Sequence, residues 1–372
     1  MAKGTSVKEK KALIVLPYLR NEDGTAVALM NYYDSLIHAG WKLDFMHLKT
    51  FECEWVEKVK KSGGEIFEIP ADNKYSKNIY KYIKEVFNQN DYSVVHLNIP
   101  GHIGFLIMKY AKKANTKVRI FHVHNPKNNI KKRTFISQSV YDQLIQKKAT
   151  NLCACTESAG LSRFGSKHFE VVRNVVDVDR FEFNLISRSK IRTSLNLDNK
   201  TVIGVVCRFA AQKNPYFLVD CFVEYKKRNP RAFLLWLGDG ELKESTKQYI
   251  KSKQIEGSYF LAGIKTDVED WYCAMDLFLL PSFFEGLGIV FLEAQCTGLP
   301  CLGSKNVPVE TEITNLMYRM DLTSPANEWA DEMVRILSKR EERVSRKKEF
   351  IDRGYTHETT KDGLVNFYNS LI

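Results

Sequence analysis

No apolar run in the 372-residue sequence approaches the roughly 18 to 20 residues that a helix needs to cross a bilayer. The longest apolar stretches are short, such as residues 233–237 and 277–280. Lysines before the apolar stretch 12–16 resemble the start of a signal peptide, but Pro17 and Arg20 interrupt it and no small-residue cleavage site follows. We therefore expect a cytoplasmic chain without a membrane-spanning helix.

Cysteine motifs for metal or disulfides are also absent. The eight cysteines form no Cys-x-x-Cys pair and have no histidine at zinc-ligand spacing. Cys153 and Cys155 share one face of a predicted strand, but they do not complete a four-ligand set. Most of the cysteines stand in apolar runs, which is typical of reduced, buried thiols in a cytosolic protein. We expect no metal site.

Proline and glycine are few, with 10 and 20 residues, so the chain is neither fibrous nor of low complexity. Its 22 Phe, 17 Tyr and 5 Trp are far more than a disordered chain carries, and they predict a sizeable core. At roughly 100 to 200 residues per domain, the length predicts two domains.

Positive charge is unevenly distributed along the chain. Residues 1–175 hold 28 Lys and Arg against 16 Asp and Glu, a balance of +12, whereas the remainder holds 27 against 28. Such an excess fits nucleic acid, an anionic lipid surface or an acidic ligand. Nucleic acid is the least favoured partner, because no helix-turn-helix, zinc-finger spacing or aromatic RNP-type strand accompanies the charge.

One segment of the basic half could contact a membrane. Residues 76–90 place four apolar side chains at helical spacing and put Lys77, Lys81 and Lys84 around the opposite side. Residues 131–133 add a second basic cluster. A surface helix that packs its apolar stripe on a sheet and leaves its lysines in water is the plainer interpretation, and the two are compatible.

Short apolar runs alternate with amphipathic stretches along the whole chain. Predicted strands are 12–16, 42–48, 66–69, 94–97, 118–123, 151–155, 168–172, 201–207, 232–237, 258–261, 277–280 and 300–302. This alternation predicts an α/β fold with parallel sheets covered on both faces. We place one domain at 1–176, a second at 177–350 and a C-terminal helix within 351–372 that packs back toward the first. Residues 25–38 are predicted to form one helix, and 339–348 a solvated charged helix.

The most informative stretch is 276–303, DLFLLPSFFEGLGIVFLEAQCTGLPCLG. A buried strand ends at Pro281, a turn carries Glu285 to Gly288, and a helix begins near Ile289. A helix N-terminus behind a glycine turn favours a phosphate, and ligands of an open parallel sheet sit beyond the carboxyl ends of its strands. The turn is therefore a candidate anion site.

Glu285 and Glu293 are eight residues apart. On one helix they would be separated by about 12 Å, which exceeds the roughly 5 to 9.5 Å between the carboxyls of a glycosidase. They are better placed to bind two diols of an extended ligand such as a nucleotide sugar. The alternatives are that Glu285 caps a helix and that Glu293 is a solvated helix residue.

The second constellation is 204–215, GVVCRFAAQKNP, in which a strand runs into Arg208 and Lys213. Two cations beyond a strand end can neutralise a diphosphate, Arg by a planar fork and Lys as a point charge. Taken alone, such residues are more often solvated charges. Their coincidence with the Glu285 turn favours a ligand site.

These stretches resemble the retaining glycosyltransferases of family 4, whose GT-B fold has two Rossmann-like doubly wound domains facing a cleft. The resemblance covers nearly the whole chain and is strongest at the R-x4-K pair Arg208 and Lys213, at 238–240, at 260–263, and at the E-x7-E pair Glu285 and Glu293. Bacterial enzymes that build capsule, exopolysaccharide or O-antigen units are the most similar subgroup.

The resemblance implies a role for each motif residue. Arg208 and Lys213 would bind the donor diphosphate, Glu293 the ribose diol, and Glu285 with the backbone of Gly286, Leu287, Gly288 and Ile289 the transferred sugar. His124 would face the donor sugar from the first domain. We expect His122 and His124 to point to opposite faces of the sheet, which leaves His122 the less favoured candidate.

The family's N-terminal loop usually carries paired glycines, whereas this chain has only Gly24 in Asn-Glu-Asp-Gly-Thr-Ala. Gly24 is the residue that could let this loop approach a phosphate.

The resemblance also implies the reaction and its partners. The expected enzyme moves a hexose or N-acetylhexosamine from a nucleotide sugar, preferably a UDP-sugar, to a polyprenyl-diphosphate-linked saccharide, with retention and without cofactor or metal. The +12 domain would hold it peripherally at anionic lipid on the inner face of the cell membrane. A GDP-sugar, mannosyl-type transferase and a non-catalytic nucleotide-sugar-binding protein of the same fold are the alternatives.

Overall fold

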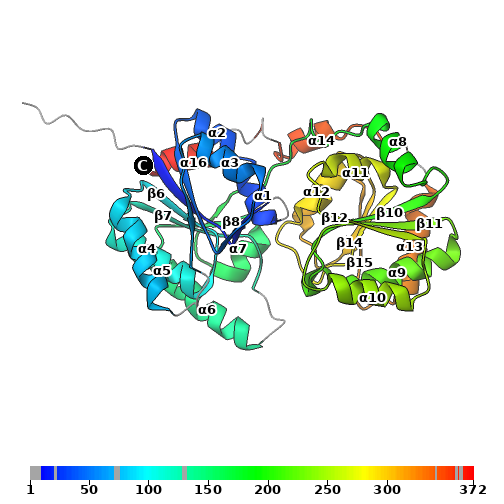
Figure 1. Ribbon diagram of the computed structural model, residues 1–372, viewed down its shortest axis with the longest axis horizontal. Coiled ribbons are helices and arrows are strands. Elements are labelled where there is room, and N and C mark those ends of the chain that lie inside the picture. The colour runs from blue at the N-terminus through cyan, green and yellow to red at the C-terminus, as the bar shows by residue number, and fades with distance from the viewer. Residues whose placement is uncertain are drawn as a thin grey trace, which may run out of the picture. The chain divides into compact units, whose positions relative to one another are not determined.

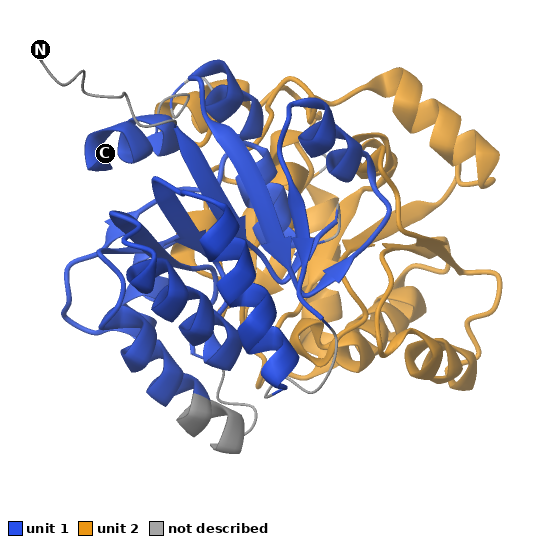
Figure 2. Cartoon of the chain, turned by 60° about the vertical axis from the view of Figure 1, so that its left-hand side comes forward, with its two compact units in different colours: residues 1–175, 359–372 blue, residues 176–358 orange. Residues whose placement is uncertain are grey.

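The computed structural model describes residues 10–20, 23–70, 76–127, 132–339, 342–356, 359 and 363–372, with 132–137 described by their backbone alone. The chain divides into two compact units, residues 1–175 with 359–372 and residues 176–358 (Figure 2). The predicted boundaries differ slightly from this division. Residue 176 and residues 351–358, which the sequence assigns elsewhere, belong to the second unit.

The first unit is built on a seven-stranded parallel sheet in the order β5-β3-β1-β6-β7-β8-β9. Its strands are β1 (Lys11–Val15), β3 (Lys42–His47), β5 (Ile66–Glu68), β6 (Val94–Leu97), β7 (Val118–Val123), β8 (Asn151–Ala154) and β9 (Glu170–Val171). Two short strands, β2 (Tyr18–Leu19) and β4 (Lys49–Thr50), pair beside it. The strand order reverses between β1 and β6, as in a doubly wound sheet.

Helices surround this sheet (Figure 1). They are α1 (Gly24–Met30), α2 (Tyr33–His38), α3 (Glu54–Lys61), α4 (Lys77–Gln89), α5 (Gly101–Lys113), α6 (Lys132–Gln146), α7 (Glu157–Phe164) and α16 (Gly363–Leu371). Residues 25–38 thus form two helices instead of the one predicted. In α4 the predicted stripe is buried and the lysines are exposed.

The C-terminal helix α16 is part of the first unit's core. Leu364, Val365 and Tyr368 are buried in the same cluster as Trp41 of the α2–β3 turn. The rings of Trp41 and Tyr368 meet edge to face with their centroids 5.0 Å apart. Apolar contact therefore fixes the last helix to the unit that begins the chain.

The second unit is built on a six-stranded parallel sheet in the order β12-β11-β10-β13-β14-β15. Its strands are β10 (Thr201–Val206), β11 (Ala232–Leu237), β12 (Tyr259–Gly263), β13 (Leu277–Leu280), β14 (Cys301–Ser304) and β15 (Met317–Met320). The helices are α8 (Leu185–Ser194), α9 (Pro215–Arg228), α10 (Lys243–Ser252), α11 (Val268–Ala274), α12 (Ile289–Cys296), α13 (Ala326–Ser338) and α14 (Lys347–Asp352), with 3₁₀ turns η1 (Ala211–Lys213) and η2 (Val309–Thr311).

Both sheets match the predicted α/β class. All twelve predicted strands are present, with ends that shift by at most two residues. The eight cysteines are free and seven of them are buried, as predicted. Among the residues that the structure describes, no helix is long and apolar enough to cross a bilayer.

The predicted solvated helix at 339–348 is wrong. Residues 342–346 are not helical, and the guanidinium of Arg343 donates hydrogen bonds to the carbonyls of Tyr272, Cys273 and Met275 at 3.0 to 3.2 Å. It also donates to the carbonyl and hydroxyl of Thr297 at 3.0 and 2.6 Å. Arg343 therefore caps the C-terminal ends of α11 and α12 together, because the last carbonyls of a helix lack partners within it.

Replacing Arg343 with Ala should lower the free energy of unfolding by about 3 kcal/mol, since the guanidinium's hydrogen bonds to four carbonyls and to the Thr297 hydroxyl are lost together. Denaturant unfolding of the full chain measures this loss. Arg353→Ala is the matched control, because Arg353 is exposed and, among the described residues, donates only to the carbonyl of Glu312. Equal stability of the two variants would contradict the capping of α11 and α12 by Arg343.

Candidate functional site

The predicted ligand loops meet where the strand order of the second sheet reverses. β10 and β13 are neighbours, with Gly204 beside Phe278, and the sheet continues from β10 to β11 on one side and from β13 to β14 on the other. Ligands of doubly wound sheets bind beyond the carboxyl ends of the strands at such a point. The loop after β10 carries Arg208 and Lys213, and the loop after β13 carries Glu285.

Main-chain and side-chain bonds join these two loops. The amide of Phe283 donates to the carbonyl of Gln212 at 2.9 Å, and Gln212 Nε2 donates to the carbonyl of Phe284 at 2.9 Å. Lys213 Nζ lies 2.7 and 2.9 Å from the two carboxylate oxygens of Glu285. The side chains of Lys213 and Glu285 are only 14% and 5% exposed, so Lys213 is not a solvated charge.

Arg208 differs from Lys213 in having no side-chain partner among the residues that the structure describes. Its side chain is half-buried and makes no hydrogen bond or ion pair with any residue in the described part of the chain. The backbone beside it is fixed, because the amide of Phe209 donates to the carbonyl of Asp239 at 3.0 Å. A rigid main chain with an uncommitted guanidinium suits an incoming anion.

Two glycines after β11 allow the backbone of residues 238–240 to lie close to the backbone of the Arg208 loop. A Cβ on Gly238 would lie 2.1 Å from the carbonyl oxygen of Cys207, and one on Gly240 would lie 2.6 Å from that of Phe209. Both glycines also have positive φ, 135° and 152°, which other residues rarely adopt. The backbone of residues 238–240 therefore packs against the Arg208 loop and holds it in place.

The glycine turn leads into a helix without a side-chain cap. Gly288 is the N-cap of α12 in the left-handed conformation, with φ of 75°, and no side chain bonds to the first amides. Leu287 and Ile289 are buried, so this turn can offer a ligand its backbone amides but not those side chains. The amide groups and the helix dipole favour a negatively charged or strongly polar group here.

Glu285 precedes α12 and Glu293 lies inside it, so the separation expected for two residues of one helix does not apply. Glu285 does not cap the helix, and Glu293 is not solvated: it is 9% exposed, and one carboxylate oxygen accepts a hydrogen bond from Tyr272 at 2.9 Å. Burial raises the pKa of Glu293 to about 7, against the lowering effects of Tyr272 and Arg180.

The first unit holds a cluster of three histidines at the carboxyl ends of the neighbouring strands β6 and β7. The ring centroids of His122 and His124 are 4.1 Å apart, so the two side chains do not point to opposite faces as predicted. The prediction was wrong because residues two apart on a strand lie on the same face. His96 of β6 lies against His122, with nitrogens 3.0 Å apart.

The glycine of the N-terminal loop lies at the start of α1. The carboxylate of Asp23 caps this helix by accepting from the amides of Thr25 and Ala26 at 3.0 and 3.2 Å. A side chain on Gly24 would meet nothing within 4 Å. Any phosphate that approached Gly24 would therefore compete with Asp23 for these amides.

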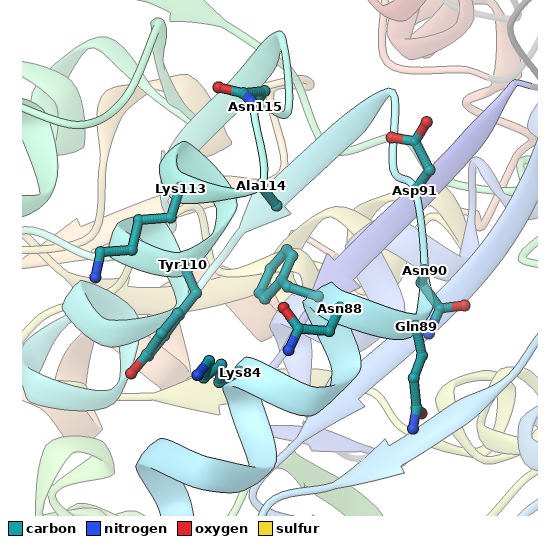
Figure 3. A pocket seen from close by; sticks show the side chains of 10 residues that line it. Lys84, Asn88, Gln89, Asn90, Asp91, Tyr110, Lys113, Ala114 and Asn115 are labelled. Atoms are coloured by element: carbon teal, nitrogen blue, oxygen red, sulfur yellow. The ribbon is translucent and has the colours of Figure 1, made fainter.

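An open hollow of about 770 Å³ lies elsewhere in the first unit, at the C-terminal ends of α4 and α5 (Figure 3). Lys84, Tyr110 and Lys113 stand on one side of it and Asn88 near its middle. Its lining includes none of the predicted site residues. Within the described residues, no group of three or more His, Cys, Asp or Glu side chains could hold a metal ion.

Sequence reasoning missed several residues of these clusters. Tyr272, Gln212 and Asn98 bond directly to Glu293, to the Glu285 loop and to His124. Each of them comes from a different element than its partner, so no local spacing could reveal the pair. His96 could have been found, since a histidine and an asparagine that end a buried strand are polar residues at a carboxyl edge.

Several known proteins are similar to this chain. Residues 187–353 match the family described as Glycosyl transferases group 1. EpsF of Bacillus subtilis, a glycosyltransferase by name, is 28% identical over 97% of each chain. The UDP-Gal:alpha-D-GlcNAc-diphosphoundecaprenol alpha-1,3-galactosyltransferase of Escherichia coli is 30% identical over 45% of this chain and 47% of its own.

The fold is shared with solved structures. Anabaena HepE, crystallised in complex with UDP and glucose, superposes with a TM-score of 0.79 over 97% of this chain and 100% of its own, at 15% sequence identity. The two Rossmann-like units therefore form a GT-B fold. The second unit carries a Glycosyl transferases group 1 domain, and with the glycosyltransferase relatives this makes the chain a glycosyltransferase.

Proposed function

We propose that the chain transfers a hexose or an N-acetylhexosamine from a nucleotide sugar, preferably a UDP-sugar, to a lipid-linked saccharide in bacterial polysaccharide synthesis. The observation that carries this proposal is the junction of β10 and β13, where Arg208, Lys213 and Glu285 lie together beside the uncapped start of α12. Support for the donor class comes from HepE, which was crystallised with UDP and glucose. Support for the acceptor comes from the galactosyltransferase, whose name specifies a diphosphoundecaprenol-linked sugar.

Each donor residue then has a defined task. Arg208 and Lys213 bind the diphosphate, the carboxylate of Glu285 and the amides of residues 286–289 bind the transferred sugar, and Glu293 accepts from the ribose diol. His124 is the donor-sugar residue of the first unit, and no metal takes part. Lys213 must be shared between Glu285 and the diphosphate, so diphosphate binding loosens the ion pair that holds Glu285 in the free enzyme.

The proposed reaction retains the anomeric configuration. The acceptor hydroxyl attacks the anomeric carbon from the face that the nucleoside diphosphate leaves. The new glycosidic bond forms as the bond to the phosphate oxygen breaks, and the hydroxyl proton passes to an oxygen of the departing diphosphate. Arg208, Lys213 and the start of α12 stabilise the charge that develops there. No side chain acts as a covalent nucleophile.

Binding of the nucleotide should depend on pH through Glu293. Ribose hydroxyls donate to an ionised carboxylate, and the pKa of Glu293 is raised to about 7. Below pH 7 the carboxylate is mostly protonated, so nucleoside diphosphate affinity should fall about tenfold per pH unit as pH drops. Isothermal titration between pH 5.5 and 8.5 measures this slope, and Glu293→Gln should reduce it to the part that comes from protonation of the diphosphate itself. An equal slope in the wild type and in Glu293→Gln would contradict this role.

We also propose that the basic first unit holds the enzyme at anionic lipid. The helices α4 and α5 are neighbours (Figure 1) and expose Lys77, Lys81, Lys84, Lys112 and Lys113. Well-placed cations contribute about 1 kcal/mol each at an anionic surface. The basic cluster at 131–133 lies outside the side chains that the structure describes.

Charge reversal tests this surface. Lys81→Glu with Lys84→Glu should weaken binding to vesicles of phosphatidylglycerol and phosphatidylcholine at least tenfold, and added salt should weaken wild-type binding in the same way. The matched control is Lys247→Glu with Lys251→Glu on exposed positions of α10 in the second unit. Absence of salt-sensitive vesicle binding by the wild type would overturn the proposal.

The transfer assay decides between the proposed enzyme and its alternatives. Wild-type protein is incubated with UDP-, GDP- and dTDP-sugars in turn and with a polyprenyl-diphosphate-linked sugar, and donor consumption is followed. Acceptor-dependent consumption of a UDP-sugar supports the proposal, and consumption of a GDP-sugar alone favours the mannosyl-type alternative. Nucleotide-sugar binding without consumption favours a non-catalytic protein.

A further inference from the structure

A continuous chain of buried hydrogen bonds joins the C-terminal helix to the histidine cluster. The hydroxyl oxygen of Tyr368 lies 2.7 Å from His96 Nδ1, and His96 Nε2 lies 3.0 Å from His122 Nδ1. Tyr368 and His96 are fully buried and His122 is 2% exposed. The His96 and His122 rings are stacked at 13°, and His124 follows with its centroid 4.1 Å from that of His122.

The hydrogen-bond partners of these atoms define which group donates and which accepts at each link from Tyr368 to His122. A neutral imidazole has one donor nitrogen and one acceptor nitrogen. If Tyr368 donates to His96 Nδ1, then His96 Nε2–H donates to His122 Nδ1, and His122 Nε2–H alone is left without an acceptor. The reverse direction leaves both the Tyr368 hydroxyl proton and His122 Nε2 unsatisfied. The first direction is favoured, because each buried polar group without a partner is costly.

Asn98 sets the tautomer of His124 in the same way. Its amide nitrogen donates to the carbonyl of His96 at 3.1 Å, so its oxygen accepts from His124 Nε2–H at 2.8 Å. His124 Nδ1 is then an acceptor. Both His124 Nδ1 and His122 Nε2 are buried and have no hydrogen-bond partner among the described residues. Burial lowers the pKa of His124 to about 3, so the ring stays neutral.

We propose that Tyr368 is a positioning residue, which fixes the tautomer of His122 through His96 so that His122 Nε2–H and His124 Nδ1 together bind one hydroxyl group of a saccharide. A hydroxyl can accept from the first nitrogen and donate to the second. This inference rests on the proposed function, in which His124 contacts the donor sugar. It gives the last helix of the chain a role in sugar binding as well as in packing.

Nitrogen NMR of histidine-labelled full-length protein tests the relay without any substrate. The wild type should show His96, His122 and His124 with the proton on Nε2, and Tyr368→Phe should change the ring-nitrogen shifts of both His96 and His122. Tyr92→Phe is the matched control, because Tyr92 is also buried in the first unit but donates to Asp44 at 2.9 Å. Nδ1–H on His96 in the wild type, or unchanged His122 shifts in Tyr368→Phe, would overturn the proposal.

Kinetics then test the consequence of the relay. Tyr368→Phe should lower kcat about tenfold and leave the affinity for the free nucleoside diphosphate within twofold, whereas Tyr92→Phe should lower neither. Equal kcat in the two variants would overturn the positioning role even if the tautomers behave as expected. Failure of the wild type with every donor would instead contradict the proposed function, and the NMR result would still decide on the relay.

Discussion

Replacing Glu285 with Gln should reduce sugar transfer at least 1000-fold. The carboxylate of Glu285 lies just before the uncapped start of α12, and Lys213 fixes it through both oxygens. Loss of its charge removes both the sugar contact and the electrostatic balance at the leaving diphosphate, where single groups contribute factors of about 100 to 1000. Steady-state rates with the donor found by the transfer screen measure this effect.

The fold should survive this substitution. Gln can still accept from Lys213, so the midpoint of thermal unfolding should change by only a few degrees, and nucleoside diphosphate should still bind. Glu256→Gln, an exposed carboxylate of the second unit, is the matched control and should retain full activity. Full activity of Glu285→Gln would contradict the assignment of Glu285 to the donor site.

Replacing Arg208 with Ala should weaken nucleoside diphosphate binding about 100-fold, equivalent to about 2.7 kcal/mol. A guanidinium that forms charge-assisted bonds to a diphosphate contributes on this scale. Arg208 has no bond to the described part of the protein, so its removal leaves no buried group unsatisfied. Stability without ligand should therefore match that of the wild type, which separates a binding residue from a structural one.

Isothermal titration with the preferred nucleoside diphosphate measures the Arg208 effect. Arg231→Ala is the matched control, because Arg231 is an exposed arginine directly before β11 and thus at the amino end of the sheet. It should bind like the wild type. Equal affinities of the two variants would remove Arg208 from the donor site.

The sequence predicts the sheets and the main motifs of the site because these signals are local. A buried strand such as β13, a glycine turn at Gly288 and the start of α12 are adjacent in the chain, and each has its own residue preference. The R-x4-K and E-x7-E spacings are equally local. Whether the loops of Arg208 and Glu285 are neighbours depends on the order of the strands in the sheet. Only the resemblance to the GT-B fold implies this order.

Features that depend on distant partners could not be predicted in the same way. Arg343 stands in a strongly charged stretch, and its burial depends on carbonyls about 46 and 70 residues away in the chain. Glu293 has a raised pKa because the fold buries it, although the hydrogen bond from Tyr272 of α11 acts in the opposite direction. β15 was missed because its sequence, MYRM, is short and half-exposed.

The histidine error has a different origin. His122 is on β7 and His124 directly follows this strand, and the alternation of side chains, continued by one residue, puts both on the same face. Applying this rule would have predicted a histidine pair. The link to His96 and Tyr368 still lay beyond the sequence, because Tyr368 is 272 residues from His96 and approaches it only through the packing of α16.

Thermal unfolding with UDP, GDP, dTDP and CDP tests the central claim, that the junction of β10 and β13 is a nucleotide-sugar donor site. A ligand at 100 times its dissociation constant adds about 2.7 kcal/mol, which raises the midpoint by several degrees in a protein of this size. We expect a selective rise with one of the four, preferably UDP, in the wild type and little or none in Arg208→Ala. No rise with any nucleotide, or the same rise in both proteins, would contradict it.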